Sequence, residues 1–194
     1  KLHLQIMQIA ILDNLDSFTY NLYHKIEPFV DSIHVVRNDD EKALDKLSNY
    51  DAWILSPGPG LPKDSGCLMK ALEMGFGKIP ILGICLGMQA IAIHHGGKLF
   101  HLTNPQHGKE HIIKNIGKDS KLFKSINPPF QVGLYHSWAV NERSINASGL
   151  IYSDSDILMA AEWIDKKAFG LQFHPESIMT PSGDKILENW INLI

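Results

Sequence analysis

The residue with the clearest capacity for chemistry is Cys85, which stands in the segment Gly83-Ile-Cys-Leu-Gly87. The apolar run over residues 79–84 predicts a strand, and the run from Cys85 to His94 has helical spacing. A tight turn between strand and helix would present the thiol above the sheet edge, and glycines on both sides remove Cβ atoms that would collide there. The helix N-terminus favours the thiolate form, so Cys85 is predicted to be a nucleophile.

The alternative for Cys85 is a structural role, because a cysteine inside an apolar run is often a small buried hydrophobic residue. The chain has one other cysteine, Cys67, which lies near the start of a predicted helix without a strand before it. We interpret Cys67 as structural. Two cysteines are too few for a disulfide framework and are compatible with a reducing compartment.

A thiol nucleophile needs a base, and the base needs a group that orients it. The segment Gln172-Phe-His-Pro-Glu-Ser177 supplies His174 and Glu176 directly after an apolar strand. Pro175 restricts the backbone between them and predicts an extended arrangement in which both side chains point the same way. Glu176 could then hold one imidazole nitrogen while the other faces Cys85. Without the cysteine, a His-Pro-Glu string would more often be an ordinary turn.

A third candidate element is the loop Ser56-Pro-Gly-Pro-Gly60. Alternating proline and glycine fix a loop whose backbone N–H groups are free to face a ligand. A tetrahedral oxyanion needs such donors, and the N–H of Leu86, which follows the nucleophile, is the natural second donor. The alternative is a simple rigid turn. A dinucleotide-binding loop is excluded, because Gly-x-Gly-x-x-Gly is absent.

Strands that alternate with helices must position these residues. The predicted strands of the first half are Met7–Leu12, Ser32–Arg37, Ala52–Leu55 and Ile79–Ile84, and the predicted helices are Ser17–Ile26, Asp40–Leu47 and one within Pro62–Gly75. This spacing indicates βαβ units and a single-domain α/β fold, with a mostly parallel open sheet flanked by helices. Because ligands bind beyond the carboxyl ends of such strands, Asp13, Gly58 and Cys85 are expected to converge at one edge.

The second half of the chain is richer in segments that indicate additional antiparallel strands. These segments are Lys98–Leu102, His111–Ile116, Gln131–His136, Ile157–Ile164 and Ala168–Phe173, and a final helix is predicted over Asp184–Leu193. The length of 194 residues and the 44% hydrophobic content suit one domain, which we assign to residues 7–194. Residues 1–6 precede Met7 and are interpreted as an N-terminal extension or a cloning remnant.

Composition excludes several classes of function. A net charge of −3 provides no basic field for a nucleic acid backbone. No apolar run approaches the ~20 residues that span a bilayer, and no signal peptide is recognisable, so a soluble cytoplasmic protein is expected. Metal binding is not expected, because the available histidines lack carboxylate companions and the spacing of a ligand set. Those histidines are His94, His95, His101, His107 and His111.

Taken together, the motifs resemble those of class I (triad) glutamine amidotransferases, in particular the small subunits of anthranilate synthase and aminodeoxychorismate synthase. The matching segments are Asp13–Asn21, Ser56–Gly60, Gly83–Gln89, His107–Lys109, Tyr135–Ser137 and Gln172–Ser177. They occur in the family's order and span nearly the whole chain from Met7. The resemblance implies a flavodoxin-like sheet and no cofactor in this subunit.

The resemblance also implies an activity, namely hydrolysis of glutamine to glutamate and ammonia through a γ-glutamyl thioester on Cys85. His174 would transfer protons and Glu176 would orient it. By similarity, Gly58, Gly60 and Leu86 would form the oxyanion and substrate site. Gln89 and the backbone around Ser137 and Trp138 would hold the α-amino and α-carboxylate groups of glutamine. Ammonia would pass to a larger chorismate-binding synthase subunit.

Two alternatives belong to other functional classes. A stand-alone cysteine hydrolase acting on γ-glutamyl or peptide substrates uses the same kind of elbow, and a non-catalytic regulatory subunit could share the fold. The complete motif set argues against the first, and retention of all three triad residues argues against the second. Whether the final product is anthranilate or aminodeoxychorismate stays open, because the small subunit supplies ammonia in either case.

Overall fold

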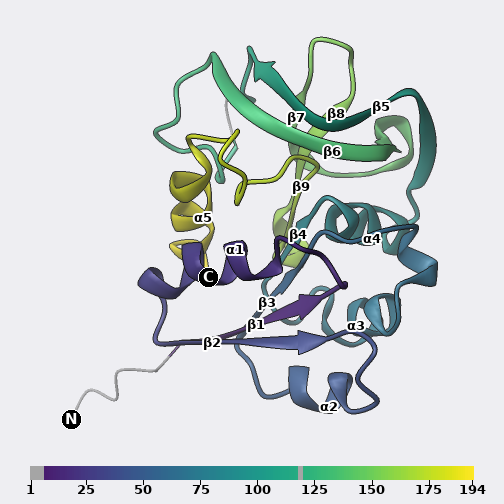
Figure 1. The fold of residues 1–194 in the computed structure, drawn as a ribbon, viewed down its shortest axis with the longest axis vertical. Coiled ribbons are helices and arrows are strands. Elements are labelled where there is room, and N and C mark those ends of the chain that lie inside the picture. Colours follow the sequence, from purple (N-terminus) through teal and green to yellow (C-terminus); the bar gives the residue numbers. More distant parts are fainter. Residues whose placement is uncertain (1–6, 118–119) are drawn as a thin grey trace.

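The computed structural model describes residues 7–117 and 120–194. Its centre is a seven-stranded sheet with the strand order β2-β1-β3-β4-β9-β8-β7 (Figure 1). The strands of the first half are β1 (Gln8–Asp13), β2 (Ser32–Arg37), β3 (Ala52–Leu55) and β4 (Ile81–Ile84). They pair in parallel, as predicted, so their carboxyl ends lie at one edge of the sheet. The extension predicted for residues 1–6 lies outside the described residues.

Helices cover both faces of this sheet (Figure 1). They are α1 (Thr19–Ile26), α2 (Ala43–Leu47), α3 (Leu68–Gly75), α4 (Leu86–His94) and α5 (Gly183–Ile191). Short 3₁₀ helices follow α1 at η1 (Glu27–Phe29) and precede α3 at η2 (Pro62–Asp64), and two more lie between strands at η3 (Glu142–Ser144) and η4 (Ile164–Lys166). None of the helices in the described residues is long and apolar enough to cross a membrane.

Strand β1 shows why both faces need helices. Its successive side chains point to opposite sides of the sheet. Ile9 and Ile11 join one apolar core with α1 and α5, whereas Ala10 and Leu12 join a second core with α2, α3 and α4. All four side chains are completely buried. This two-sided burial is characteristic of parallel sheets and explains why the strand reads as a continuous apolar run.

The strand predicted over Ala168–Phe173 differs from expectation in its pairing. It forms β9 (Ala168–Leu171), which pairs in parallel with β4 on one side and antiparallel with β8 (Leu158–Trp163) on the other. Parallel pairing continues the first-half sheet, and the short connection through η4 imposes the antiparallel pairing with β8. A further strand, β7 (Ser148–Tyr152), was not predicted and forms the edge beyond β8.

The segments predicted over Lys98–Leu102 and His111–Ile116 belong to one long strand, β5 (Lys98–Ile113). It pairs antiparallel with β6 (Phe130–Asn141) in a separate two-stranded ribbon, which curves over the end of the molecule that carries β7 and β8 (Figure 1). Register shifts interrupt the ribbon near its middle. Most of the central β5 residues are polar and exposed, so they carry no alternating pattern from which a strand could be predicted.

The helix predicted within Pro62–Gly75 is α3, and η2 precedes it. Between them, Gly66 has a φ of +50°, and a Cβ there would lie 2.4 Å from the carbonyl oxygen of Asn38. The same carbonyl accepts a hydrogen bond of 2.9 Å from the backbone N–H of Cys67. The chain is therefore held against the loop after β2, and α3 begins only beyond this contact.

Candidate active site

Cys85 occupies a strained turn between β4 and α4. Its φ of +50° and ψ of −100° lie in a region that side-chain-bearing residues rarely adopt. A Cβ on Gly83 would lie 2.4 Å from the backbone of Gly87, and one on Gly87 would lie 2.3 Å from the carbonyl oxygen of Leu55. Only glycine fits at either position, so the sequence prediction of a cysteine elbow framed by two obligatory glycines is confirmed.

His174 and Glu176 follow β9 and lie at the same edge as Cys85. His174 Nδ1 and Glu176 Oε1 are 2.6 Å apart, and both residues are almost fully buried, with 3% exposure each. The prediction that Pro175 keeps this segment extended is wrong. Residues 174–177 form a turn in which the backbone N–H of Ser177 donates to the carbonyl of His174 at 3.2 Å. Proline suits the second position of such a turn, and the turn itself brings the two side chains together.

The backbone of His174 is fixed by hydrogen bonds on both sides. Its N–H donates to the carbonyl of Gly133 on β6 at 3.1 Å, and its carbonyl accepts from Thr180 Oγ1 at 2.7 Å. The imidazole contacts the rings of Tyr135 and Phe18, with centroid separations of 4.8 and 6.3 Å. The ring therefore has little freedom to turn away from Glu176.

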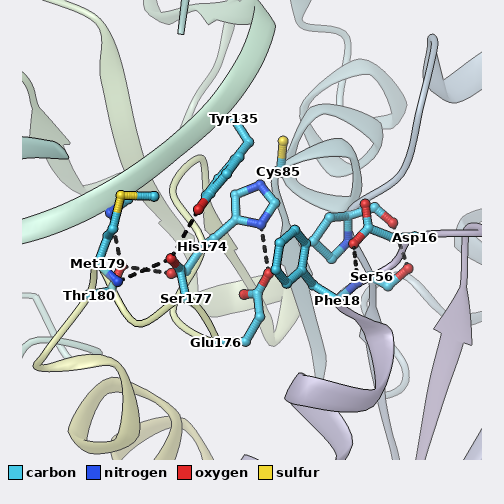
Figure 2. A network of polar contacts seen from close by, with 12 residues as sticks. Asp16, Phe18, Ser56, Cys85, Tyr135, His174, Glu176, Ser177, Met179 and Thr180 are labelled. Carbon is cyan, nitrogen blue, oxygen red and sulfur yellow. Dashed lines mark hydrogen bonds and ion pairs between the residues drawn. The ribbon is translucent and has the colours of Figure 1, made fainter. Parts of the chain in front are cut away.

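Figure 2 shows the His174 ring between Glu176 and Cys85. Because Nδ1 bonds the carboxylate, Nε2 is the nitrogen left for the thiol, and this buried atom has no hydrogen-bond partner among the described residues. Burial by itself lowers the pKa of His174, but Cys85 and Glu176 outweigh that effect and raise the pKa well above its ordinary value of 6.5. The ring is thus set to take a proton from sulfur and hold it beside a carboxylate.

The loop predicted to supply oxyanion donors is held by the loop after β1. The backbone N–H of Asn14 donates to Ser56 Oγ and its side-chain amide donates to the Ser56 carbonyl, both at 2.8 Å. A Cβ on Gly58 would lie 2.6 Å from the Asn14 carbonyl and 2.8 Å from the Leu86 side chain. Glycine is therefore required for the loop to lie this close to the start of α4.

A pocket of about 200 Å³ opens beside the Cys85 elbow. Its lining includes Cys85 and all six residues predicted to form the oxyanion and substrate site, namely Gly58, Gly60, Leu86, Gln89, Ser137 and Trp138. His174 and Glu176 stand behind the nucleophile and do not line it. Within the pocket wall, Gln89 Nε2 donates to the carbonyl of Trp138 at 2.9 Å, which joins α4 to β6.

The pocket also contains residues to which the sequence had assigned no substrate role. These are Pro59, His107, Tyr135 and His136. His107 Nε2 lies 2.8 Å from Ser137 Oγ across the β5–β6 ribbon. The sequence motifs around His107 and Tyr135 could have indicated a role for these two residues. Only the register of the β5–β6 ribbon, which pairs His107 with Tyr135, shows that both lie at this pocket. One proline and three aromatic side chains thus complete a site suited to a small molecule with polar groups.

Cys67 differs from Cys85 in its surroundings. It is only partly buried, it precedes α3 without a strand before it, and burial raises the pKa of its thiol. Neither cysteine takes part in a disulfide. Across residues 7–117 and 120–194, no group of three or more His, Cys, Asp or Glu side chains is placed to hold a metal ion.

Two solved structures share this fold. A protein of Thermoplasma acidophilum, provisionally described as one subunit of a GMP synthase, superposes with a TM-score of 0.86 at 22% identity, covering 98% of this chain and 95% of that one. A glutamine amidotransferase of Thermotoga maritima gives a TM-score of 0.69 at 18% identity, covering 89% and 77% of the two chains. These likenesses support the mostly parallel α/β architecture.

Relatives with closer sequences are named as anthranilate synthase component 2 or as aminodeoxychorismate synthase. Anthranilate synthase component 2 of Lactococcus lactis is 39% identical over 189 residues, covering 96% of this chain and 94% of the relative. The pyocyanine-specific component 2 of Pseudomonas aeruginosa is 37% identical over 187 residues, with coverages of 94% and 92%. Aminodeoxychorismate synthase of Streptomyces griseus is 36% identical over an alignment of 197 residues, which covers 96% of this chain and 26% of that longer protein.

The family model that describes class-I glutamine amidotransferases matches residues 10–193. That range contains the elbow, the His174–Glu176 pair and every residue of the pocket. The chain therefore belongs to the class-I glutamine amidotransferase family.

Proposed function

We propose that this chain is the glutaminase subunit of a chorismate-using synthase. It hydrolyses the side-chain amide of glutamine and delivers the ammonia to a larger subunit that forms anthranilate or aminodeoxychorismate. The observation that carries the proposal is the arrangement of Cys85 beside a glutamine-sized polar pocket, with the buried His174–Glu176 pair behind it. A buried thiol, base and orienting carboxylate are the parts that nucleophilic acyl transfer needs.

The reaction proceeds in two halves. Cys85 Sγ attacks the amide carbon of glutamine as its proton passes to His174 Nε2. The carbon–nitrogen bond then breaks, and His174 returns that proton to the departing ammonia, which leaves a γ-glutamyl thioester. A water molecule next gives a proton to His174 and attacks the thioester carbon. The carbon–sulfur bond then breaks and His174 gives that proton to the departing sulfur, which releases glutamate and restores the thiol.

The pocket supplies the remaining groups. The backbone N–H of Leu86 and the loop containing Gly58 and Gly60 stabilise the oxyanion that forms during each attack. Gln89 and the backbone around Ser137 and Trp138 hold the α-amino and α-carboxylate groups. This subunit needs no metal or organic cofactor for these steps, because thiol, imidazole and carboxylate perform every proton and acyl transfer.

The partner in this proposal is a chorismate-binding synthase subunit, as the names of the relatives suggest. Both cysteines are free thiols, which supports activity in the reducing cytoplasm.

Three large apolar side chains lie exposed at the carboxyl edge of the sheet, around the site. Leu15 follows β1 and is 48% exposed, Tyr20 opens α1 and is 62% exposed, and Ile178 follows the triad turn and is 96% exposed. We propose that they contact the synthase subunit.

Transfer of nitrogen tests the proposed function directly. The chain and its synthase partner are supplied with chorismate and with glutamine that carries heavy nitrogen in its amide, and the product amine is analysed by mass spectrometry. We expect the label to appear in the product even when unlabelled ammonia is present in solution. Release of all the label into solution would instead support a stand-alone hydrolase.

A binding titration of the chain with the synthase subunit tests the docking surface formed by Leu15, Tyr20 and Ile178. Ile178→Asp places a charge where an apolar side chain is buried in the complex, so we expect affinity for the synthase to fall about tenfold or more. Hydrolysis by the isolated chain should be unchanged. The matched control is Ile164→Asp, because Ile164 is also exposed but lies in η4 at the opposite edge of the sheet. Equal effects of the two substitutions would contradict this placement of the partner.

A further inference from the structure

Gln172 is a completely buried polar side chain that has no part in the steps above. It directly follows β9, and its backbone N–H donates to the carbonyl of Met159 on β8 at 2.8 Å. A buried amide is costly unless its donor and its acceptor both find partners. The side chain lies between two elements of the site. It contacts Gln89 of α4 at 3.2 Å and the sulfur of Cys85 at 3.6 Å.

The hydrogen bonds fix which end of the Gln172 amide faces the sulfur. The carbonyl oxygen of Trp138 can only accept, so the group of Gln89 that contacts it at 2.9 Å is the NH₂. The same NH₂ contacts Gln172 at 3.2 Å and therefore meets the Gln172 oxygen. The remaining group of Gln172, its NH₂, is directed at Cys85 Sγ.

An N–H donor directed at sulfur stabilises the thiolate and the thiol to different extents. A hydrogen bond to a charged acceptor is stronger than one to a neutral acceptor, so an N–H at this position stabilises the thiolate over the thiol. The separation of 3.6 Å is suitable for a large sulfur acceptor. In the proposed reaction His174, whose pKa is raised by Cys85 and Glu176, receives the proton of the same cysteine.

The contacts form one continuous series from the pocket wall to the nucleophile. It runs from the Trp138 carbonyl through the amides of Gln89 and Gln172 to Cys85 Sγ. We infer that Gln172 is a positioning residue, which fixes the Cys85 sulfur relative to the glutamine pocket and stabilises it as the thiolate. This inference rests on the proposed function, because it assigns Gln172 a part in the thiolate attack.

Two substitutions separate this role from simple packing. Gln172→Glu keeps the size of the side chain and an acceptor for Gln89 but removes the N–H that faces sulfur. Gln172→Met keeps similar volume and removes both polar contacts. The matched control is Gln131→Met, since Gln131 is a partly buried glutamine whose amide donates to the Met179 carbonyl at 3.1 Å, outside the glutamine pocket.

The measurement is the rate of alkylation by iodoacetamide as a function of pH, made on the full chain in a Cys67→Ser background. We expect alkylation of Cys85 at pH 6 to slow about tenfold in both Gln172 variants, with the profile displaced to higher pH. The turnover number for glutamine should fall about tenfold, while KM changes less than about threefold. Gln131→Met should leave the alkylation profile unchanged.

Profiles of both Gln172 variants that overlay the parent profile would overturn the inference. So would an equal displacement in Gln131→Met, because that would show a general effect of losing a glutamine amide. The alkylation assay requires neither glutamine nor the synthase partner. Failure of the parent chain to hydrolyse glutamine in complex with the synthase subunit would therefore contradict the proposed function, while alkylation would still report on the contact between Gln172 and sulfur.

Discussion

Replacement of Cys85 by serine is expected to abolish glutamine-dependent product formation by the assembled synthase, with a loss of roughly 10⁴-fold. Ammonia-dependent formation of the same product should persist at the wild-type rate. The serine hydroxyl fits the strained elbow but is a much weaker nucleophile than a thiolate beside a proton-accepting imidazole. We therefore expect the complex to lose the use of glutamine as nitrogen donor, while the synthase subunit still forms the product from free ammonia.

Both rates can be measured with chorismate and the synthase subunit, using either glutamine or an ammonium salt. Cys67→Ser is the matched control, because it makes the same chemical change at a thiol that lies outside the pocket and near α3. It should leave both rates unchanged. If Cys85→Ser eliminates the ammonia-dependent rate as well, the cysteine has a structural role in the complex and the chain is not simply an ammonia supplier.

The second large effect is expected from Glu176→Gln. Glu176 is buried and accepts the Nδ1–H of His174 at 2.6 Å, so the substitution removes the charge that stabilises the imidazolium. We expect glutamine hydrolysis to fall roughly a thousandfold, with a much smaller change in KM, because the lost interaction acts in the transition state. Steady-state hydrolysis of glutamine measures this, with Glu188→Gln as a control in which an exposed carboxylate next to Lys185 is replaced.

The same substitution should change how stability depends on pH. Cys85 and Glu176 raise the pKa of His174 in the folded protein, so its protonation stabilises the fold fully below the ordinary value of 6.5. That contribution is lost as the pH rises through the raised pKa. The wild type and Glu176→Gln should therefore differ less in their free energy of unfolding as the pH rises from 6.5 through the raised pKa of His174. Denaturant titrations at several pH values measure this difference. A difference that stays constant would mean that His174 is not the group responsible.

The parts of this molecule that the sequence predicts well are those that depend on local pattern. The run from residue 79 to 94 specifies a strand, an elbow and a helix because glycine is the only residue that fits at Gly83 and Gly87. The parallel strands β1, β3 and β4 are similarly evident from continuous apolar runs, since both faces of each are buried. Local sterics and burial leave few other arrangements for such segments.

The parts that the sequence does not predict depend on contacts between distant segments. The middle of β5 is polar and exposed, and pairing with β6, not its own composition, makes it a strand. β9 pairs with β4 and β8 in opposite senses, which no pattern within its four residues encodes. The proximity of Asn14 to Ser56 is also non-local, although it fixes the loop that lies against Leu86.

The candidate site shows the same division. Its chemical groups follow from residue types, and Cys85, His174 and Glu176 were all predicted to act together. The backbone geometry that brings His174 and Glu176 together was not predicted from the sequence, because Pro175 was expected to extend the segment and instead occupies a turn. The contact of Gln172 with sulfur was also missed, since a glutamine ahead of the His-Pro-Glu string carries no sign of where its side chain will point.

The central claim is that Cys85 carries the γ-glutamyl group, and the most direct measurement is mass spectrometry of the chain after rapid mixing with glutamine and quenching in acid. We predict a γ-glutamyl adduct on the peptide that contains Cys85, no adduct on the peptide that contains Cys67, and no adduct in Cys85→Ser. An adduct on a different residue, or hydrolysis of glutamine at the wild-type rate by Cys85→Ser, would contradict the account.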